Sequence, residues 1–253
     1  MYELCLIGIG TGNPEHLTYE GARTIRNADL ILIPRKGVGK GDLAELRLEI
    51  IAKAAGASPP EIRFFDIPER HDTNGYLQGV DDWHDAIARI WQATIATAPA
   101  VQNVALLIWG DPSLYDSSLR IAARLDPSPK TRVIPGITAL QALTAAHAVA
   151  LNEIGAPVLV TTGRRLRDQG WPTDVNTLAV MLDGQCSFQS LDMDGVDIWW
   201  GAYLGMKEQL LISGALRDVA GQIVETRAQA RADHGWIMDI YLLKKHGRNG
   251  DQG

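Results

Sequence analysis

The hydrophobic positions in the first half of the chain alternate between short apolar runs and longer stretches with helical spacing. Runs that are apolar at consecutive positions are typical of strands buried on both faces of a sheet. The stretches between them place apolar side chains three or four residues apart, as an amphipathic helix does. This pattern predicts a mostly parallel α/β sheet covered by helices. The predicted strands are Leu4–Ile9, Leu30–Ile33, Ile62–Ile67, Val104–Trp109 and Arg132–Ile134.

Local signals mark the ends of the helices between these strands. Thr18 is placed as an N-cap, and Asp42 with Glu45 three residues later forms a start that is similar to a capping box. Pro99 closes the longest helical stretch, because proline cannot continue a helix. The predicted helices are Thr18–Asn27, Asp42–Ala55, Tyr76–Ala98 and Leu114–Leu125.

The pattern changes from Thr138 onward, where strands and helices no longer alternate regularly. The gap between the third and fourth strands of this half is too short for a parallel crossover, so that pair is predicted to be antiparallel. We expect an N-terminal α/β domain (1–138), a C-terminal mixed α/β domain (139–245) and a disordered polar tail (246–253). The predicted strands are Val158–Thr162, Leu178–Leu182, Ile198–Leu204, Leu210–Ser213 and Trp236–Leu243, and the predicted helices are Leu140–Val149 and Val219–Ala232.

Composition narrows the class of protein. The chain has 253 residues, of which 46% are hydrophobic and 21% charged, as in soluble globular proteins. No apolar stretch is long enough to span a membrane, and an acidic residue stands where a signal peptide needs basic ones. Cys5 and Cys186 lie in apolar segments, so we expect reduced, buried thiols in a cytoplasmic protein. The net charge of −6 argues against nucleic acid as the partner.

Three turns that follow predicted strands are the candidates for chemistry. They read IGIGTGNPEHLT (7–18), WGDPSLYDSSLR (109–120) and VIPGITALQAL (133–143). Glycine lets backbone amides approach a ligand closely, and ligands of open α/β sheets bind at the carboxyl ends of strands. Taken singly, each turn could also be an ordinary strand-to-helix connection, with Asp111 only capping a helix at Ser113 or Leu114.

In this order and with these spacings, the three turns resemble the tetrapyrrole methylase family, the class III S-adenosylmethionine-dependent methyltransferases. The resemblance covers nearly the whole chain. Thr11 stands where the family loop usually has proline, and Asp116-Ser117 replace a usual Gly-Arg, which argues against the uroporphyrinogen III methyltransferase branch. Four further stretches are similar to the branch that methylates precorrin-5 at C1 with release of acetate: PRKG (34–37), MLDG (181–184), WWGAYLG (199–205) and GWIMDIYLL (235–243).

The resemblance implies a two-domain tetrapyrrole-methylase fold with S-adenosyl-L-methionine in a cleft between the domains and S-adenosyl-L-homocysteine as a product. By spacing alone, Met181, Leu182, Tyr203 and Leu204 of the C-terminal domain would be ordinary core residues. Only the resemblance makes them candidates for cofactor binding. The implied cofactor-binding residues are Gly10, Thr11, Gly110, Asp111, Leu114, Tyr115, Thr138, Ala139, Met181, Leu182, Tyr203 and Leu204.

The implied substrate is a reduced tetrapyrrole whose many carboxylates require arginine and lysine donors. Two basic clusters follow predicted strands, and their candidate substrate-binding residues are Arg35, Lys36, Arg164 and Arg165, with Lys40 and Arg167 beside them. Attack of water on the acetyl carbonyl needs a general base, for which Asp111, Tyr115 and Asp116 are the candidates and His71 and His147 the weaker ones. The sequence shows no Ser-His-Asp motif and no metal-ligand spacing.

Several alternatives stay open at the level of sequence. The chain could be a family member that acts on another precorrin, on diphthamide or on ribosomal RNA, the last disfavoured by net charge. It could bind a nucleotide as an NAD(P)-dependent oxidoreductase, although the glycines at 8, 10 and 12 lack the Rossmann spacing. It could also sequester a tetrapyrrole without catalysis. Family members are commonly homodimers, but the sequence shows no self-complementary surface.

Overall fold

A computed structural model describes residues 2–35, 42–56, 58–70, 75–98 and 100–246 of the chain. The described chain forms two compact units, which divide between Thr138 and Ala139. The predicted tail beyond residue 246 lies outside the described residues, as do Lys36, Lys40 and His71.

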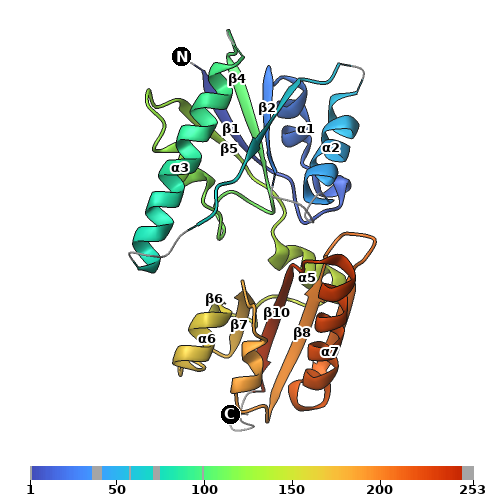
Figure 1. The fold of residues 1–253 in the computed structure, drawn as a ribbon. Helices are drawn as coiled ribbons and strands as arrows, with labels where there is room; N and C mark the ends of the chain where they lie inside the picture. The colour runs from blue at the N-terminus through green and yellow to red at the C-terminus, as the bar shows by residue number, and fades with distance from the viewer. Residues whose placement is uncertain (1, 36–41, 57, 71–74, 99, 247–253) are drawn as a thin grey trace. The chain divides into compact units, whose positions relative to one another are not determined.

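The first unit is built on a five-stranded, entirely parallel sheet with the strand order β3-β2-β4-β1-β5 (Figure 1). The parallel sheet predicted from the consecutive apolar runs is therefore confirmed. The strands are β1 (Glu3–Gly8), β2 (Leu30–Arg35), β3 (Glu61–Asp66), β4 (Asn103–Ile108) and β5 (Lys130–Ile134).

Helices cover both faces of this sheet, so its buried side chains form two apolar layers. One layer holds Leu4 and Leu6 of β1 against α3 and α4, and the other holds Cys5 and Ile7 against α1 and α2. The helices of this unit are α1 (Tyr19–Arg26), α2 (Asp42–Ala55), α3 (Tyr76–Ala96), α4 (Ser118–Ala122) and the 3-10 turn η1 (Pro14–His16).

Capping explains where two of these helices begin. The Thr18 hydroxyl accepts a hydrogen bond from the Gly21 amide at 3.0 Å, so the predicted N-cap of α1 is confirmed. The predicted helix from Leu114 to Leu125 is wrong over its first part. Its backbone is broken at Tyr115, where φ is 50°, and α4 begins only at Ser118, whose amide donates to the Asp116 carboxylate at 2.6 Å.

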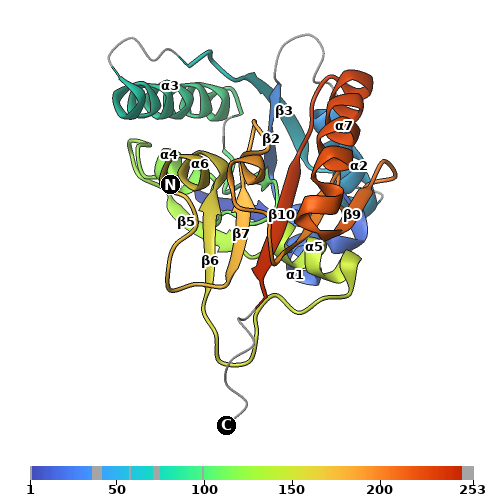
Figure 2. The same cartoon turned by 90° about the horizontal axis from the view of Figure 1, so that it is seen from below.

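The second unit has a mixed sheet with the order β6-β7-β10-β8-β9 (Figure 2). Only β6 and β7 are parallel, and the predicted antiparallel pairing of β8 with β9 is confirmed. The strands are β6 (Val158–Thr162), β7 (Thr177–Met181), β8 (Val196–Ala202), β9 (Leu210–Ala215) and β10 (Asp239–Lys245).

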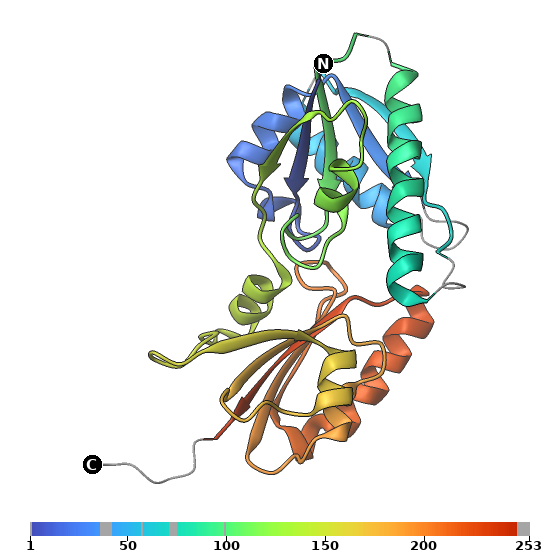
Figure 3. The same ribbon diagram turned by 90° about the vertical axis from the view of Figure 1, so that its left-hand side faces the viewer.

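Helices α6 and α7 pack on one face of this sheet and α5 on the other (Figure 3). Helix α6 was not predicted, because its seven residues are mostly charged and only Gly163 and Leu166 are buried. Within the described residues, no helix is long and apolar enough to cross a membrane. The helices of this unit are α5 (Ala139–His147), α6 (Gly163–Gln169), α7 (Leu216–His234) and the 3-10 turn η2 (Ser187–Ser190).

Candidate functional site

The three glycine-containing turns of the first unit meet in space. Gly10 and Gly110 exchange two backbone hydrogen bonds, from Gly10 N to Gly110 O at 3.3 Å and from Gly110 N to Gly10 O at 2.8 Å. Gly136 of the third turn lies against both Gly8 and Gly110. The turns that follow β1, β4 and β5 thus form one compact backbone cluster, as the resemblance predicts.

Two of the glycines are required by close packing of backbone. A Cβ atom at Gly136 would lie 2.1 Å from the carbonyl oxygen of Gly110, and one at Gly8 would lie 2.6 Å from the amide nitrogen of Gly136. Real contacts are never this short, so no other residue fits without moving the backbone. The fold thus shows why glycine is needed at positions 8 and 136, which the sequence spacing alone does not reveal.

Asp111 ties the second turn to the third. Its Oδ1 accepts hydrogen bonds from the Ser113 amide at 2.8 Å and from the Ser113 hydroxyl at 2.5 Å, and its Oδ2 accepts from the Gly136 amide at 2.8 Å. It caps no helix, because α4 begins only at Ser118.

The same contacts set the acidity of this buried carboxylate. Burial raises the pKa of Asp111, but the hydrogen bonds from Ser113 and Gly136 outweigh burial and leave the pKa below its ordinary value. A carboxylate with occupied oxygens and a lowered pKa is a poor proton acceptor. The geometry therefore supports a positioning role for Asp111 rather than the role of general base.

Two buried polar atoms beside the glycine turn have no hydrogen-bond partner among the described residues. They are Thr11 Oγ1 and His16 Nδ1. Leaving a buried polar atom unpaired costs about 1–3 kcal/mol, so such atoms mark places where a bound ligand can supply the missing partner. The turn after β1 therefore fits a polar ligand.

In the second unit, the predicted cofactor residues Met181 and Leu182 lie where β7 ends, next to a buried polar network. Leu182 has φ 54° and is 65% exposed. The next residue, Asp183, is buried and accepts hydrogen bonds from the Ser187 amide at 2.6 Å and the Tyr241 hydroxyl at 2.6 Å. Sequence reasoning missed this network, although an acid after an apolar strand was a visible signal.

Tyr203 and Leu204 are both buried. The Tyr203 hydroxyl is shared between two backbone carbonyls, Trp236 O at 2.5 Å and Ala230 O at 3.2 Å. The side chain thus belongs to the core, as its spacing alone indicated, and only the backbone at this position can serve a cofactor.

The remaining candidate residues lie at different depths. Leu114, Asp116, Thr138 and Met181 are half-buried, whereas Tyr115 is 44% exposed. Ala139 begins α5. The arginine candidates are all exposed: the Arg35 guanidinium stacks on the ring of Phe64 at 4.1 Å, and Arg164 and Arg165 lie on α6. Within the described residues, no group of acidic, histidine or cysteine side chains could hold a metal ion.

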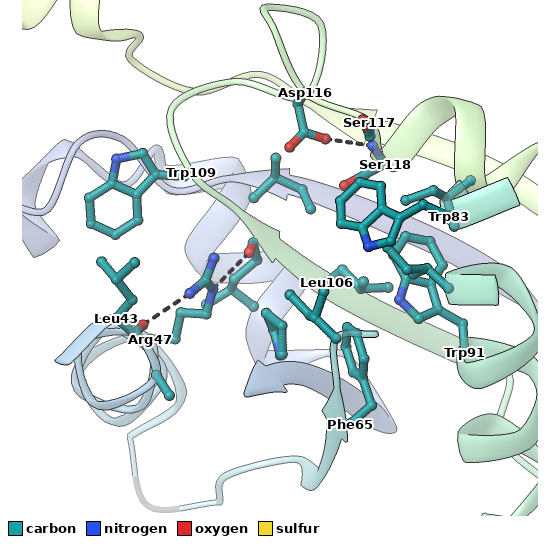
Figure 4. A pocket seen from close by; sticks show the side chains of 17 residues that line it. Leu43, Arg47, Phe65, Trp83, Trp91, Leu106, Trp109, Asp116, Ser117 and Ser118 are labelled. Atoms are coloured by element: carbon teal, nitrogen blue, oxygen red, sulfur yellow. Dashed lines mark hydrogen bonds between the residues drawn. The ribbon is translucent and has the colours of Figure 1, made fainter. Parts of the chain in front are cut away.

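A pocket opens where β2 and β4 separate. The two strands pair only from Leu30 to Leu32. If the pairing of β2 with β4 continued in the same register, the Leu107 carbonyl would accept a hydrogen bond from the backbone amide of residue 34. Residue 34 is a proline, which has no N–H to donate. Arg47 of α2 replaces this donor, because its Nε donates to Leu107 O at 3.1 Å (Figure 4). Proline thus opens the sheet, and arginine satisfies the carbonyl that is left.

The pocket has a volume of about 240 Å³ and is mostly aromatic and aliphatic. Arg47 lies on one side, with a second hydrogen bond to Leu43 O at 3.0 Å, and Asp116 and Ser117 lie on another (Figure 4). Burial lowers the pKa of Arg47 to about 10, while the charge of Asp116 acts in the opposite direction, so the guanidinium stays protonated at neutral pH. The Trp91 indole nitrogen in this lining has no partner among the described residues.

The first comparison with known proteins concerns the family. The profile of the family described as Tetrapyrrole (Corrin/Porphyrin) Methylases matches residues 3–220. The chain belongs to this family. The family resemblance inferred from the three turns and the predicted fold class are both confirmed.

Individual relatives are similar over the full length. The chain is 45% identical to "Precorrin-6A synthase [deacetylating]" of Sinorhizobium sp, over 97% of this chain and 96% of the relative. It matches the crystal structure of a cobalamin synthesis related protein (CobF) from Corynebacterium diphtheriae at 36% identity and a TM-score of 0.82, covering 97% of this chain and 99% of that one.

More distant structures share the fold. A uroporphyrin-III C-methyl transferase from Thermus thermophilus, complexed with S-adenyl homocysteine, is 18% identical with a TM-score of 0.58 and covers 96% of this chain and 92% of that one. At this identity the match shows the fold alone.

Proposed function

We propose that the chain is an S-adenosylmethionine-dependent C-methyltransferase of cobalamin biosynthesis, which methylates precorrin-5 at C1 and releases acetate to give precorrin-6A. One observation carries the proposal: 45% identity, over nearly the whole of both chains, to a relative named as the deacetylating precorrin-6A synthase. The similarity at the same length to the CobF structure supports it.

The proposed methyl donor is S-adenosyl-L-methionine, which supplies an electrophilic methyl group when bound. In the first unit, we assign its recognition to the backbone of Gly10, Gly110 and Thr138 and to the unpaired Thr11 hydroxyl. Asp111 holds the turns in place. Leu114, Tyr115 and Ala139 stay assigned to the same ligand by resemblance alone.

In the second unit, the proposed cofactor contacts are the half-buried Met181, the exposed Leu182 that follows it, and the backbone at Tyr203 and Leu204. The network around Asp183 supports this assignment, because it fixes the residue that directly follows Leu182. Apolar side chains with nearby backbone amides and carbonyls are what an adenine ring needs.

The proposed tetrapyrrole carries many carboxylates, for which we assign Arg35, Lys36, Arg164 and Arg165. The three of these that the structure describes are exposed, so a substrate can reach them. We propose a small-molecule substrate and neither nucleic acid nor a membrane as a partner, in line with the net charge of −6. Two free, buried cysteines support a place in the reducing cytoplasm.

Mass spectrometry of the product tests the function. The purified chain is incubated with S-adenosylmethionine and precorrin-5 and, in parallel, with other precorrins. We expect a product from precorrin-5 that has gained a methyl group and lost an acetyl group. A methylated product that retains the acetyl group, or methylation of another precorrin only, would assign a different activity within the family.

A further inference from the structure

A serine and a histidine from distant parts of the first unit form a hydrogen-bonded pair. Ser117 Oγ and His84 Nε2 are 2.8 Å apart and come from positions 33 residues apart in the chain. His84 lies on α3, and Ser117 directly precedes α4. A hydroxyl in contact with an imidazole is the arrangement that activates serine as a nucleophile.

The Ser117 hydroxyl does not cap the helix that follows it. Ser117 occupies the N-cap position of α4, but its side chain makes no capping hydrogen bond. The neighbouring Asp116 takes this role by accepting from the Ser118 amide. Ser117 is half-buried and lines the pocket between β2 and β4 (Figure 4). His84 is 3% exposed and is not one of the described residues that line this pocket. Ser117 thus joins the pocket to a buried histidine.

The surroundings of His84 favour the neutral imidazole. Burial lowers its pKa, and the positive charges of Arg124 and Arg120 act in the same direction. The acids on the same helix, Asp81 and Asp85, have the opposite effect, but both are paired with Arg124. A neutral imidazole can accept a proton from the serine hydroxyl.

We propose that Ser117 is the nucleophile that removes the acetyl group from the tetrapyrrole and that His84 is its general base. This inference rests on the proposed function, which requires that a carbon–carbon bond to an acetyl group be broken. It is an alternative to the prediction that Asp111, Tyr115 or Asp116 activates water for this step.

The step balances as follows. Ser117 Oγ bonds to the acetyl carbonyl carbon while its proton passes to His84 Nε2 and then to solvent. The bond between that carbon and C1 breaks, and its electron pair stays on C1 and the conjugated macrocycle, where it is available for methylation. The acetyl group remains as an ester on Ser117. Water cleaves the ester, which restores the serine and releases acetate and a second proton.

The pocket suits this chemistry. It is lined mostly by aromatic and aliphatic side chains, and it is large enough for an acetyl group together with the adjoining edge of a pyrrole ring. The protonated Arg47 has no carboxylate within ion-pair distance among the described residues, so its charge can stabilise a negatively charged oxygen in the pocket.

Single-turnover experiments with precorrin-5 and S-adenosylmethionine test the proposal. The wild type, Ser117→Ala, His84→Gln and a control, Ser190→Ala, are quenched in acid at successive times, and both acetate and the peptide that contains residue 117 are analysed. Ser190 is a matched control, because its hydroxyl also makes a 2.8 Å hydrogen bond, to Ser187 O, far from the pocket residues in sequence. S-adenosylhomocysteine binding checks that each variant is folded.

We expect a transient acetyl group on Ser117 in the wild type and in Ser190→Ala. Acetate release should fall by about a hundredfold or more in Ser117→Ala and His84→Gln, with unchanged S-adenosylhomocysteine binding. If His84→Gln does not fold, Ser117→Ala decides, because that side chain is half-exposed.

Two results would overturn the inference alone: acetate release by Ser117→Ala within about tenfold of the wild type, or acetate release by the wild type with no acetylated peptide at any time. If the wild type releases no acetate from precorrin-5, the proposed function fails first, and the role of Ser117 fails with it.

Discussion

Asp111 joins the second turn of the cluster to the third, because its carboxylate accepts hydrogen bonds from both Ser113 and Gly136. In the wild type, both carboxylate oxygens of Asp111 accept hydrogen bonds from backbone N–H groups. Asparagine would place its NH2 group, which is a donor, against at least one of these N–H groups. We expect Asp111→Asn to lower the free energy of unfolding by about 1–3 kcal/mol. Denaturant unfolding at neutral pH measures the change. Asp174→Asn, at an exposed acid, is the control and should change stability by less than about 0.5 kcal/mol.

The pH dependence of the same variant gives a second prediction. The pKa of Asp111 in the folded chain lies below its ordinary value of 3.8. Its stabilising contribution is therefore complete above that value and is lost as pH falls through the folded-state pKa. We expect the stability difference between wild type and Asp111→Asn to shrink as pH falls below about 4. A difference that grows in acid would contradict this account of the carboxylate.

Single residues also show which parts of the site could be predicted. The Thr18 cap follows from a local rule, because its partner, the Gly21 amide, lies three positions away. The contacts of Gly8 with Gly136 and of Gly10 with Gly110 join distant parts of the chain. The Ser117–His84 contact joins residues 33 positions apart, and no local pattern marks it. The Tyr241–Asp183 contact spans 58 positions. Only the fold makes such pairs visible.

At the scale of elements, the packing of the turn after β5 against the turns after β1 and β4 depends on glycine. Because a Cβ at Gly136 would collide with backbone, we expect Gly136→Ala to destabilise the chain by about 3 kcal/mol and to abolish S-adenosylhomocysteine binding. Gly221→Ala is the matched control. It lies on an exposed face of α7 with open space around it, and should stabilise the chain by about 0.5–1 kcal/mol. Equal effects of the two substitutions would contradict the packing argument.

A buried ion pair joins α7 to β10. Arg227 Nε lies 2.9 Å from Asp239 Oδ2, and the two side chains are 11% and 8% exposed. Arg227→Met leaves a buried carboxylate without its charge partner, so we expect a loss of about 3–5 kcal/mol in thermal or denaturant unfolding. Arg217→Met removes an exposed pair with Asp194 and should cost less than about 1 kcal/mol. A small effect of Arg227→Met would show that Asp239 is satisfied without it.

The sequence predicted elements well where buried apolar residues define them. It predicted them poorly where the residues of a turn set the start of a helix or where most residues of a helix are charged. Strands β1, β2 and β4 follow from continuous apolar runs. Strands β3 and β5 were also predicted, although each has only one buried residue. Helix α4 is much shorter than its periodicity indicated, because Tyr115 leaves helical geometry and Asp116 starts the helix late. Helix α6 was missed, because charged residues outnumber its buried ones.

At the scale of the whole molecule, family membership and fold are shown, and the ligand class follows as a prediction. A ligand that binds only the folded chain raises its stability by about 2.7 kcal/mol at a concentration one hundred times its Kd. We expect S-adenosylhomocysteine to stabilise the chain in this way and NADH to have no effect. Thermal unfolding with each ligand measures this. Stabilisation by NADH alone would favour the oxidoreductase alternative.

The most direct test of the central claim is the ratio of acetate to S-adenosylhomocysteine formed in one reaction with precorrin-5. The proposed function couples loss of the acetyl group to methyl transfer, so the two products should form in equal amounts over many turnovers. S-adenosylhomocysteine formed without acetate would contradict the claim, because it would show a methyltransferase that does not deacetylate its substrate.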